Sequence, residues 1–276
     1  MFAKLLKYEW KASAGLLGIL SGAVLGIGLA AGFALRSLIE LTKSVADNTG
    51  NTLGMVPLGF FLIFAILALV IYGFAVQIIL LSRFYKSRFT DEGYLTFTLP
   101  VSTWENYLSS LVHMQIWNLI SMVTIFVAVV MMLLVGLSGM GNALQAMFGT
   151  YGDVYQDTLV EDGYGLYMGV NLLYTVVSFF TAPALMMTSI TLGAVLAKKH
   201  KILAAIGVYY LMSMAIGFLT SFSSVLLTLN GAGMLTSEYY TALAASAGWQ
   251  TLVLIALSVG GSFLSVWLMN RKLNLP

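Results

Sequence analysis

Residues 57–81 read PLGFFLIFAILALVIYGFAVQIILL, and this stretch decides the class of the protein. It contains no Asp, Glu, Lys or Arg along its whole length. A helix needs about 20 mostly apolar residues to cross the hydrocarbon core of a bilayer. The stretch is long enough to do so, and it predicts a membrane-spanning helix.

Stretches of the same kind recur along the chain, and none of them contains an acidic residue, Lys or Arg. The six predicted spans lie at about 12–35, 57–81, 106–137, 168–197, 202–229 and 248–269. The chain of 276 residues is 59% hydrophobic and only 9% charged, whereas soluble domains carry roughly 25% charged residues. We therefore expect an all-α polytopic membrane protein that forms one domain over residues 1–276.

Lys and Arg concentrate in alternate connections between the predicted spans. Cytoplasmic segments of membrane proteins carry the excess of these residues. One set of segments holds Lys4, Lys7, Lys11, Arg83, Lys86, Arg88, Lys198, Lys199, Lys201, Arg271 and Lys272. The other set holds only Arg36 and Lys43. The sequence therefore predicts that both termini and the stretch 83–103 are cytoplasmic.

Several classes of chemistry lack their sequence signatures. The chain has no cysteine, no G-x-x-x-x-G-K-[ST] phosphate loop and no H-E-x-x-H metal motif. Its two histidines are His113, expected at the membrane interface, and His200, in a basic turn. No buried base is expected beside the serines and threonines of the spans, so we expect no enzymatic activity, no cofactor or metal, and no nucleic acid bound by this chain.

The predicted spans also lack the carboxylates or lysines that usually carry the coupling charge of ion-driven transporters. Their notable polar residues are Gln77, Gln115, Asn118 and Asn171. Such side chains commonly form hydrogen bonds between helices, and contact with a substrate is the alternative.

The first residues, MFAKLLKYEWKAS, show helical periodicity. Lys4, Lys7 and Lys11 fall on one face of a helix, roughly opposite Trp10. This pattern predicts a separate amphipathic helix that lies in the interface, with its lysines on lipid headgroups. It is either an anchor or a lever between the membrane and a cytoplasmic partner.

The stretch RFYKSRFTDEGYLTFTLPVST, residues 83–103, separates the second and third spans. The second span is expected to continue as a helix through Lys86. Ser102 and Glu105 match the capping box S-x-x-E, which predicts the start of the third span. Between them, Asp91 and Glu92 suit the first turn of a short helix. The apolar residues that follow either dock a partner or fold back on the headgroups.

The segments KLLKYEWK (4–11) and FYKSRFTDEGYLTFTLPVST (84–103) resemble permease subunits of ATP-binding-cassette transporters of the type 2 exporter class, closest to those of Gram-positive bacteria. The order D-E-G-Y-L-T-x-T-L-P is the most specific part, and the six-span layout extends the resemblance along the chain. The resemblance implies a bacterial cell-membrane exporter for an amphiphilic, peptide, lipid or drug cargo.

The resemblance also implies partners. Two permeases would pair, as a homodimer or heterodimer, each with a separate cytoplasmic ATPase that binds ATP and magnesium. The ATPase would bind a coupling helix made by Phe89, Thr90, Asp91, Glu92, Gly93, Tyr94 and Leu95. A second contact would be the turn Lys198, Lys199, His200 and Lys201. The alternatives are an ion-coupled or passive transporter, or a membrane scaffold or immunity protein that binds a peptide.

Two further expectations concern packing. The family tends to carry a re-entrant hairpin before the last span, and residues 230–247 fit it, with a plain surface loop as the alternative. Gly18, Gly22 and Gly26 form a ladder of small residues that lets helices approach closely. The ladder is either a seam within the chain, which we favour, or a dimer face.

Overall fold

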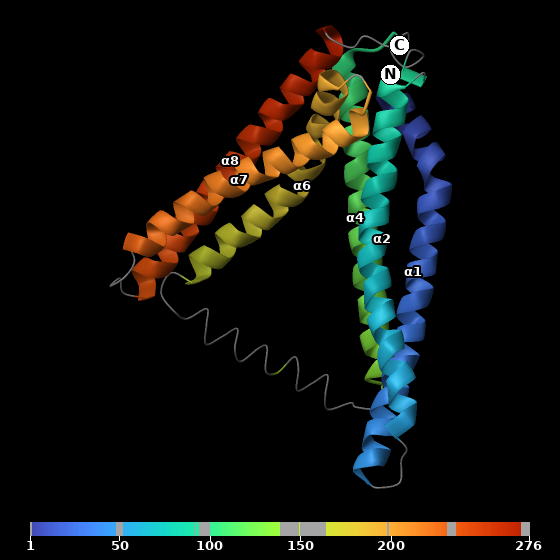
Figure 1. Cartoon of the computed structure of the whole chain (residues 1–276). Helices are drawn as coiled ribbons and strands as arrows, with labels where there is room; N and C mark the ends of the chain where they lie inside the picture. The colour runs from blue at the N-terminus through green and yellow to red at the C-terminus, as the bar shows by residue number, and fades with distance from the viewer. Residues whose placement is uncertain are drawn as a thin grey trace. The chain divides into compact units, whose positions relative to one another are not determined.

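The computed structural model describes residues 2–47, 52–90, 92–93, 100–138, 149, 164–197, 199–230 and 236–271. Within these residues it is all helical (Figure 1). The long helices are α1 (Phe2–Ala46), α2 (Met55–Phe89), α4 (Thr103–Gly136), α6 (Tyr164–Leu196), α7 (Lys201–Asn230) and α8 (Thr236–Arg271), and a short 3-10 turn, η1 (Thr52–Gly54), precedes α2.

These six helices are long and apolar enough to cross a membrane. Large apolar side chains are exposed along them; Phe64 and Phe74 of α2 are 65% and 66% exposed. A soluble protein rarely leaves so much contiguous apolar surface in water, whereas lipid solvates it. The prediction of an all-α polytopic membrane protein with six spans is confirmed at this level.

The chain divides into two compact units. The first, here called the α1 unit, combines α1 with residues 55–80 of α2 and residues 112–136 of α4. The second, called the α8 unit, combines residues 81–111 with α6, α7 and α8. The end of α2 and the start of α4 therefore pack with the last three helices. That the whole chain acts as one membrane domain stays a prediction.

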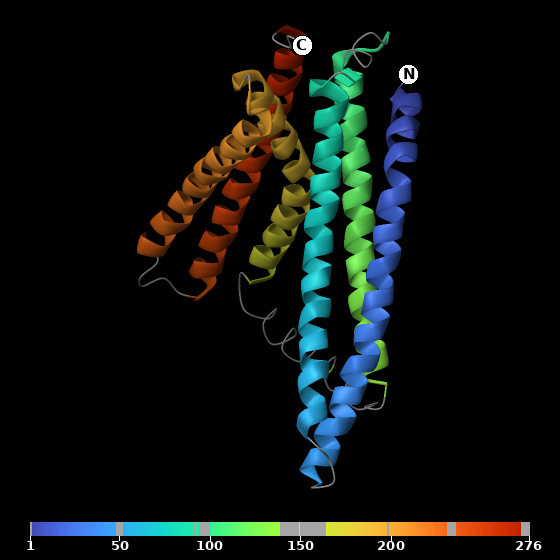
Figure 2. The ribbon, with the colours of Figure 1, turned by 45° about the vertical axis from the view of Figure 1, so that its right-hand side comes forward.

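In the α1 unit, three helices lie side by side (Figures 1 and 2). Gly28 of α1 permits a close approach of the two backbones, because a Cβ there would lie 2.7 Å from the carbonyl oxygen of Ala128 in α4. Gln77 of α2 donates a hydrogen bond to Asn118 of α4 at 2.6 Å. This bond confirms the predicted interhelical role of Gln77 and Asn118.

Helix α1 corrects the prediction of a separate interface helix. Residues 2–13 are its first turns, and the helix continues without interruption to Ala46, over 45 residues. At 1.5 Å per residue that is about 68 Å, far more than the hydrocarbon core of a bilayer. The segment contains no proline and no glycine before Gly15, so nothing in the sequence ends the helix before the span.

In the α8 unit, α6 packs against both α7 and α8. The backbone of Gly193 in α6 lies directly against that of Ala205 in α7. A Cβ on Gly261 of α8 would lie 2.8 Å from the hydroxyl of Thr188 in α6, and Ser265 donates to the same hydroxyl at 3.2 Å. Small residues thus set these helix contacts, as expected where no water drives association.

Helix α8 corrects the predicted hairpin at 230–247. Residues 236–247 form its first turns, without the chain reversal that a hairpin requires, and residues 231–235 lie outside the described part. The sequence TSEYYTALAASA has no proline or glycine and is rich in alanine, the best helix former. The segment is moderately apolar and rich in small residues, which fitted a re-entrant hairpin, but a continuous helix also satisfies every backbone group at membrane depth.

Candidate functional site

The predicted coupling helix starts later than expected, because Phe89 is the last residue of α2. Its ring is only 4% exposed and contacts those of Phe84 and Tyr85, with centroids 6.0 and 5.9 Å apart. Assigning Phe89 to the docking surface is therefore wrong: its apolar ring is packed within the protein. The expectation that α2 continues through Lys86 is confirmed.

A turn follows α2. The N–H of Gly93 donates to the carbonyl of Thr90 at 2.8 Å, and Glu92 and Gly93 are helical. Glu92 is exposed, whereas Gly93 is buried. Asp91, Tyr94 and Leu95 lie outside the described residues, so their part in a coupling helix stays a prediction.

Arg88 fixes the end of α2 to the start of α4. It is 1% exposed, and its guanidinium donates to the backbone carbonyl and the side-chain oxygen of Asn106 at 2.8 and 2.7 Å. It also donates to the Ser110 hydroxyl, and its charge lies 4.8 Å from the centre of the Phe84 ring. A buried charge is costly unless it is hydrogen bonded, and the planar guanidinium can donate to several acceptors at once.

The start of α4 is closed by the predicted capping box. The N–H of Glu105 donates to the Ser102 hydroxyl at 3.2 Å, and the N–H of Ser102 donates to the Glu105 carboxylate at 3.3 Å. These reciprocal bonds satisfy backbone donors that the helix leaves open. They confirm that α4 begins directly after Ser102.

The first turns of α4 also pack against the end of α8. Thr103 is hydrogen bonded to Asn270, and the Tyr107 hydroxyl donates to Ser262 at 3.1 Å. The Trp104 ring meets Phe263 edge to face, with centroids 4.9 Å apart. We call these contacts, together with those of Arg88, the anchor cluster. It joins the end of α2 to the start of α4, and the start of α4 to α8.

The second predicted contact is the turn between α6 and α7. Lys199 and His200 are exposed, Lys201 is the first residue of α7, and Lys198 lies outside the described residues. The carbonyl of His200 accepts from the N–H of Ala204 at 3.0 Å, which forms the first turn of α7. The turn displays positive charge, and its binding of a partner stays a prediction.

The glycine ladder of α1 is open in the structure. A Cβ on Gly18, Gly22 or Gly26 would meet no atom within 4 Å. Within the α1 unit the ladder forms no helix seam, and the favoured prediction of an intrachain seam at these three glycines stays a prediction. The seam between α1 and α4 lies further along α1, at Gly28 and Gly32, because these glycines fall on the face of α1 that contacts α4. A dimer face at Gly18, Gly22 and Gly26 stays a prediction.

The first turns of α1 place their lysines as predicted. Lys4, Lys7 and Lys11 are exposed along one face. Trp10 is half-buried and stacks on Trp117 of α4, with ring centroids 4.9 Å apart and planes at 19°. Trp10 thus attaches α1 to another helix, in addition to any role at the lipid boundary.

Sequence reasoning missed a polar cluster beside this stack, formed by Glu9, Ser13 and His113. His113 is 3% exposed, so it is packed between helices, and its expected depth at the membrane interface stays a prediction. Its Nε2 lies 2.8 Å from the Ser13 hydroxyl, and its Nδ1 lies 3.8 Å from the Glu9 carboxylate. One signal was present: Glu9 and Ser13 are four residues apart, as are His113 and Trp117, so each pair shares a helix face.

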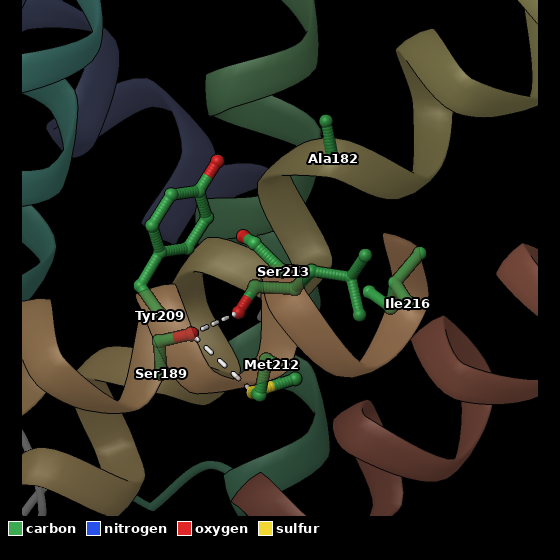
Figure 3. A pocket seen from close by; sticks show the side chains of 7 residues that line it. Ala182, Ser189, Tyr209, Met212, Ser213 and Ile216 are labelled. Carbon is green, nitrogen blue, oxygen red and sulfur yellow. Dashed lines mark hydrogen bonds between the residues drawn. The ribbon is translucent and has the colours of Figure 1, made fainter. Parts of the chain in front are cut away.

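Between α6 and α7 lies a small pocket of about 80 Å³ (Figure 3). Its lining is mostly apolar, with the hydroxyl groups of Ser189, Ser213 and Tyr209. Pockets for drug-sized ligands have volumes of about 300–1,000 Å³. This pocket accommodates only a few atoms, so it is not a cargo site by itself.

No three potential metal-ligating side chains gather within the described residues. Comparison of the chain with protein-family models, with curated proteins and with solved structures gave no match.

Proposed function

We propose that this chain is the permease subunit of an ATP-driven exporter, in which a separate cytoplasmic ATPase binds the stretch between α2 and α4. Paired with a second permease, it would carry an amphiphilic, peptide, lipid or drug cargo across a bacterial cell membrane. ATP and magnesium would be bound by the ATPase, and this chain would catalyse no bond chemistry.

The anchor cluster is the observation that carries the proposal. A connection that serves only as a turn needs no buried arginine to hold its two ends together. Here Arg88 joins the end of α2 to Asn106 and Ser110 of α4, and Thr103 and Tyr107 join α4 to α8. Packed interiors deform little, so a displacement of residues 90–102 would pass to all three helices.

Exposed groups at the proposed contacts have the required chemistry. Glu92 offers an exposed carboxylate, and Lys199 and His200 offer an exposed basic turn. Charges of both signs give a partner a defined orientation and speed its association. The apolar side chains among residues 94–99, Tyr94, Leu95, Phe97 and Leu99, would supply the buried part of such an interface.

The test is co-purification from native membranes. The chain, tagged at its C-terminus, is extracted in mild detergent, and the bound proteins are identified while ATP hydrolysis is assayed. We expect a stoichiometric ATPase with a phosphate loop and vanadate-sensitive activity. We expect Glu92→Lys to reduce its recovery several-fold, whereas the charge-matched Glu238→Lys, also at an exposed glutamate, leaves recovery unchanged.

A well-folded preparation without an ATPase would overturn the proposal and favour a passive transporter or a peptide-binding scaffold. If the Glu92→Lys chain recovers as much ATPase as the wild-type chain, the docking surface does not include this turn.

An ion-coupled transporter is the second candidate, and one observation favours it. The buried His113 faces the Glu9 carboxylate at 3.8 Å, so α4 does contain an ionisable group of the kind that coupled transporters use. Transport that persists without ATP and follows the proton gradient would support this candidate over the first.

A further inference from the structure

The cluster of Glu9, Ser13 and His113 contains none of the residues assigned to the ATPase contacts of the first proposed function. All three residues belong to the α1 unit, and they join α1 to α4. Ser13 and His113 are 2% and 3% exposed. The Glu9 side chain is 20% exposed, so it links the buried ring to the surface.

The hydrogen bonds of Ser13 allow the ring to exist in two protonation states. When His113 is neutral with its proton on Nδ1, Nε2 accepts from the Ser13 hydroxyl, which lies 2.8 Å away. When a proton from water adds to the lone pair of Nε2, that nitrogen becomes a donor. The Ser13 hydroxyl can then accept, because it can turn its own hydrogen to the carbonyl of Glu9 or Trp10, at 3.2 and 3.3 Å.

The next feature of the site is the set of charged groups near the His113 imidazole. The Glu9 carboxylate, on α1, lies 3.8 Å from Nδ1 and would pair with a protonated ring. On α4, residues 106–136 carry no Asp, Glu, Lys or Arg. The Trp10 ring system and the imidazole lie nearly perpendicular, at 85°, with centroids 6.5 Å apart.

We propose that Glu9, Ser13 and His113 form a proton-binding site that joins α1 to α4. The ring takes up one proton, the Ser13 hydroxyl reverses its hydrogen bond, and Glu9 gains an ion pair with the imidazolium. Protonation therefore tightens the attachment of the first turns of α1. The site does not depend on an ATPase partner, and it needs no other ligand.

A hydrolytic role for the same three residues lacks support. The Ser13 hydroxyl is buried and lies within hydrogen-bonding distance of carbonyls of its own helix. A serine nucleophile needs access for its substrate and donors for the oxyanion. Uptake of a proton requires neither.

The test is the titration of the two histidines by nuclear magnetic resonance. The full chain, with ¹⁵N-labelled histidine, is placed in lipid nanodiscs and followed from pH 5 to 9. Because the chain has only two histidines, His200→Gln assigns both signals, and the exposed His200 serves as internal reference. We expect His113 to titrate, and its protonated fraction at pH 6 to fall several-fold in Glu9→Gln. The circular dichroism couplet of the stacked Trp10 and Trp117 should follow the same titration.

A His113 ring that stays neutral in the wild-type chain from pH 5 to 9 would overturn the proposal without any variant at the cluster. A protonated fraction unchanged in Glu9→Gln would overturn it as well. Ser13→Ala provides a second variant: it removes the hydroxyl but keeps the ion pair, and it should change which nitrogen of the neutral ring carries the proton.

Discussion

At the scale of single residues, burial separates charges that look alike in the sequence. Arg83, Lys86 and Arg88 follow the second span within six positions and count equally toward a cytoplasmic assignment. In the structure Lys86 is exposed, whereas Arg88 is 1% exposed and bonds to Asn106 and Ser110. Of Lys86 and Arg88, only Arg88 therefore holds two helices together.

We predict that Arg88→Ala lowers the free energy of unfolding by about 2–4 kcal/mol, because it leaves buried acceptors on α4 without their charged donor. Arg88→Lys should lose less, since it keeps the charge but not the planar array of donors. Lys86→Ala, at an exposed position of the same helix, should change stability little. Thermal unfolding in nanodiscs measures all three. An Arg88→Ala chain that unfolds at the wild-type temperature would contradict the anchor cluster.

At the scale of elements, helices extend until something in the chain stops them. Residues 2–13 and 236–247 each have the polarity of interfacial or loop segments, yet each is the start of a long helix. Neither contains a proline or glycine. By contrast, the start of α4 was predicted at about Ser102, one residue before the helix begins, because a capping box has a defined hydrogen-bond pattern.

The glycines of α1 give a prediction at this scale. Gly28→Ala should destabilise the protein by about 1–3 kcal/mol, because its Cβ would lie 2.7 Å from the backbone of Ala128. Gly22→Ala is the matched control: its Cβ meets no atom within 4 Å, and alanine favours the helix by up to about 1 kcal/mol. Unfolding of both variants in the same detergent measures the difference. If the Gly28→Ala and Gly22→Ala chains are equally stable, Gly28 is not part of the contact between α1 and α4.

At the scale of the whole molecule, the six apolar helices fix the class of the protein, but they do not fix which face of the membrane each connection occupies. The expected arrangement rests on the distribution of Lys and Arg. It places residue 47, after the first span, outside the cell, and residue 200, after the fourth, in the cytoplasm.

The absence of cysteine makes this arrangement directly measurable. We predict that a membrane-impermeant maleimide labels Asp47→Cys in intact cells, and that it labels His200→Cys only after the cells are permeabilised. Both positions are exposed in the structure. The wild-type chain is the control for background labelling. The reverse pattern would invert the topology and remove residues 90–102 and 199–201 from the reach of a cytoplasmic ATPase.

The sequence by itself determined the membrane class, the number of spans and the start of α4. These features depend on composition and on hydrogen bonds between residues close in the chain, which local pattern records. Only the tertiary structure decided that Gly28 rather than Gly22 forms a helix seam, that Phe89 and Arg88 are buried, and that His113 meets Glu9 and Ser13. The partners of Gly28, Arg88 and His113 in these contacts come from other helices, up to about one hundred residues away along the chain. Which faces of two helices meet depends on the packing of all their side chains, and no local pattern contains that information.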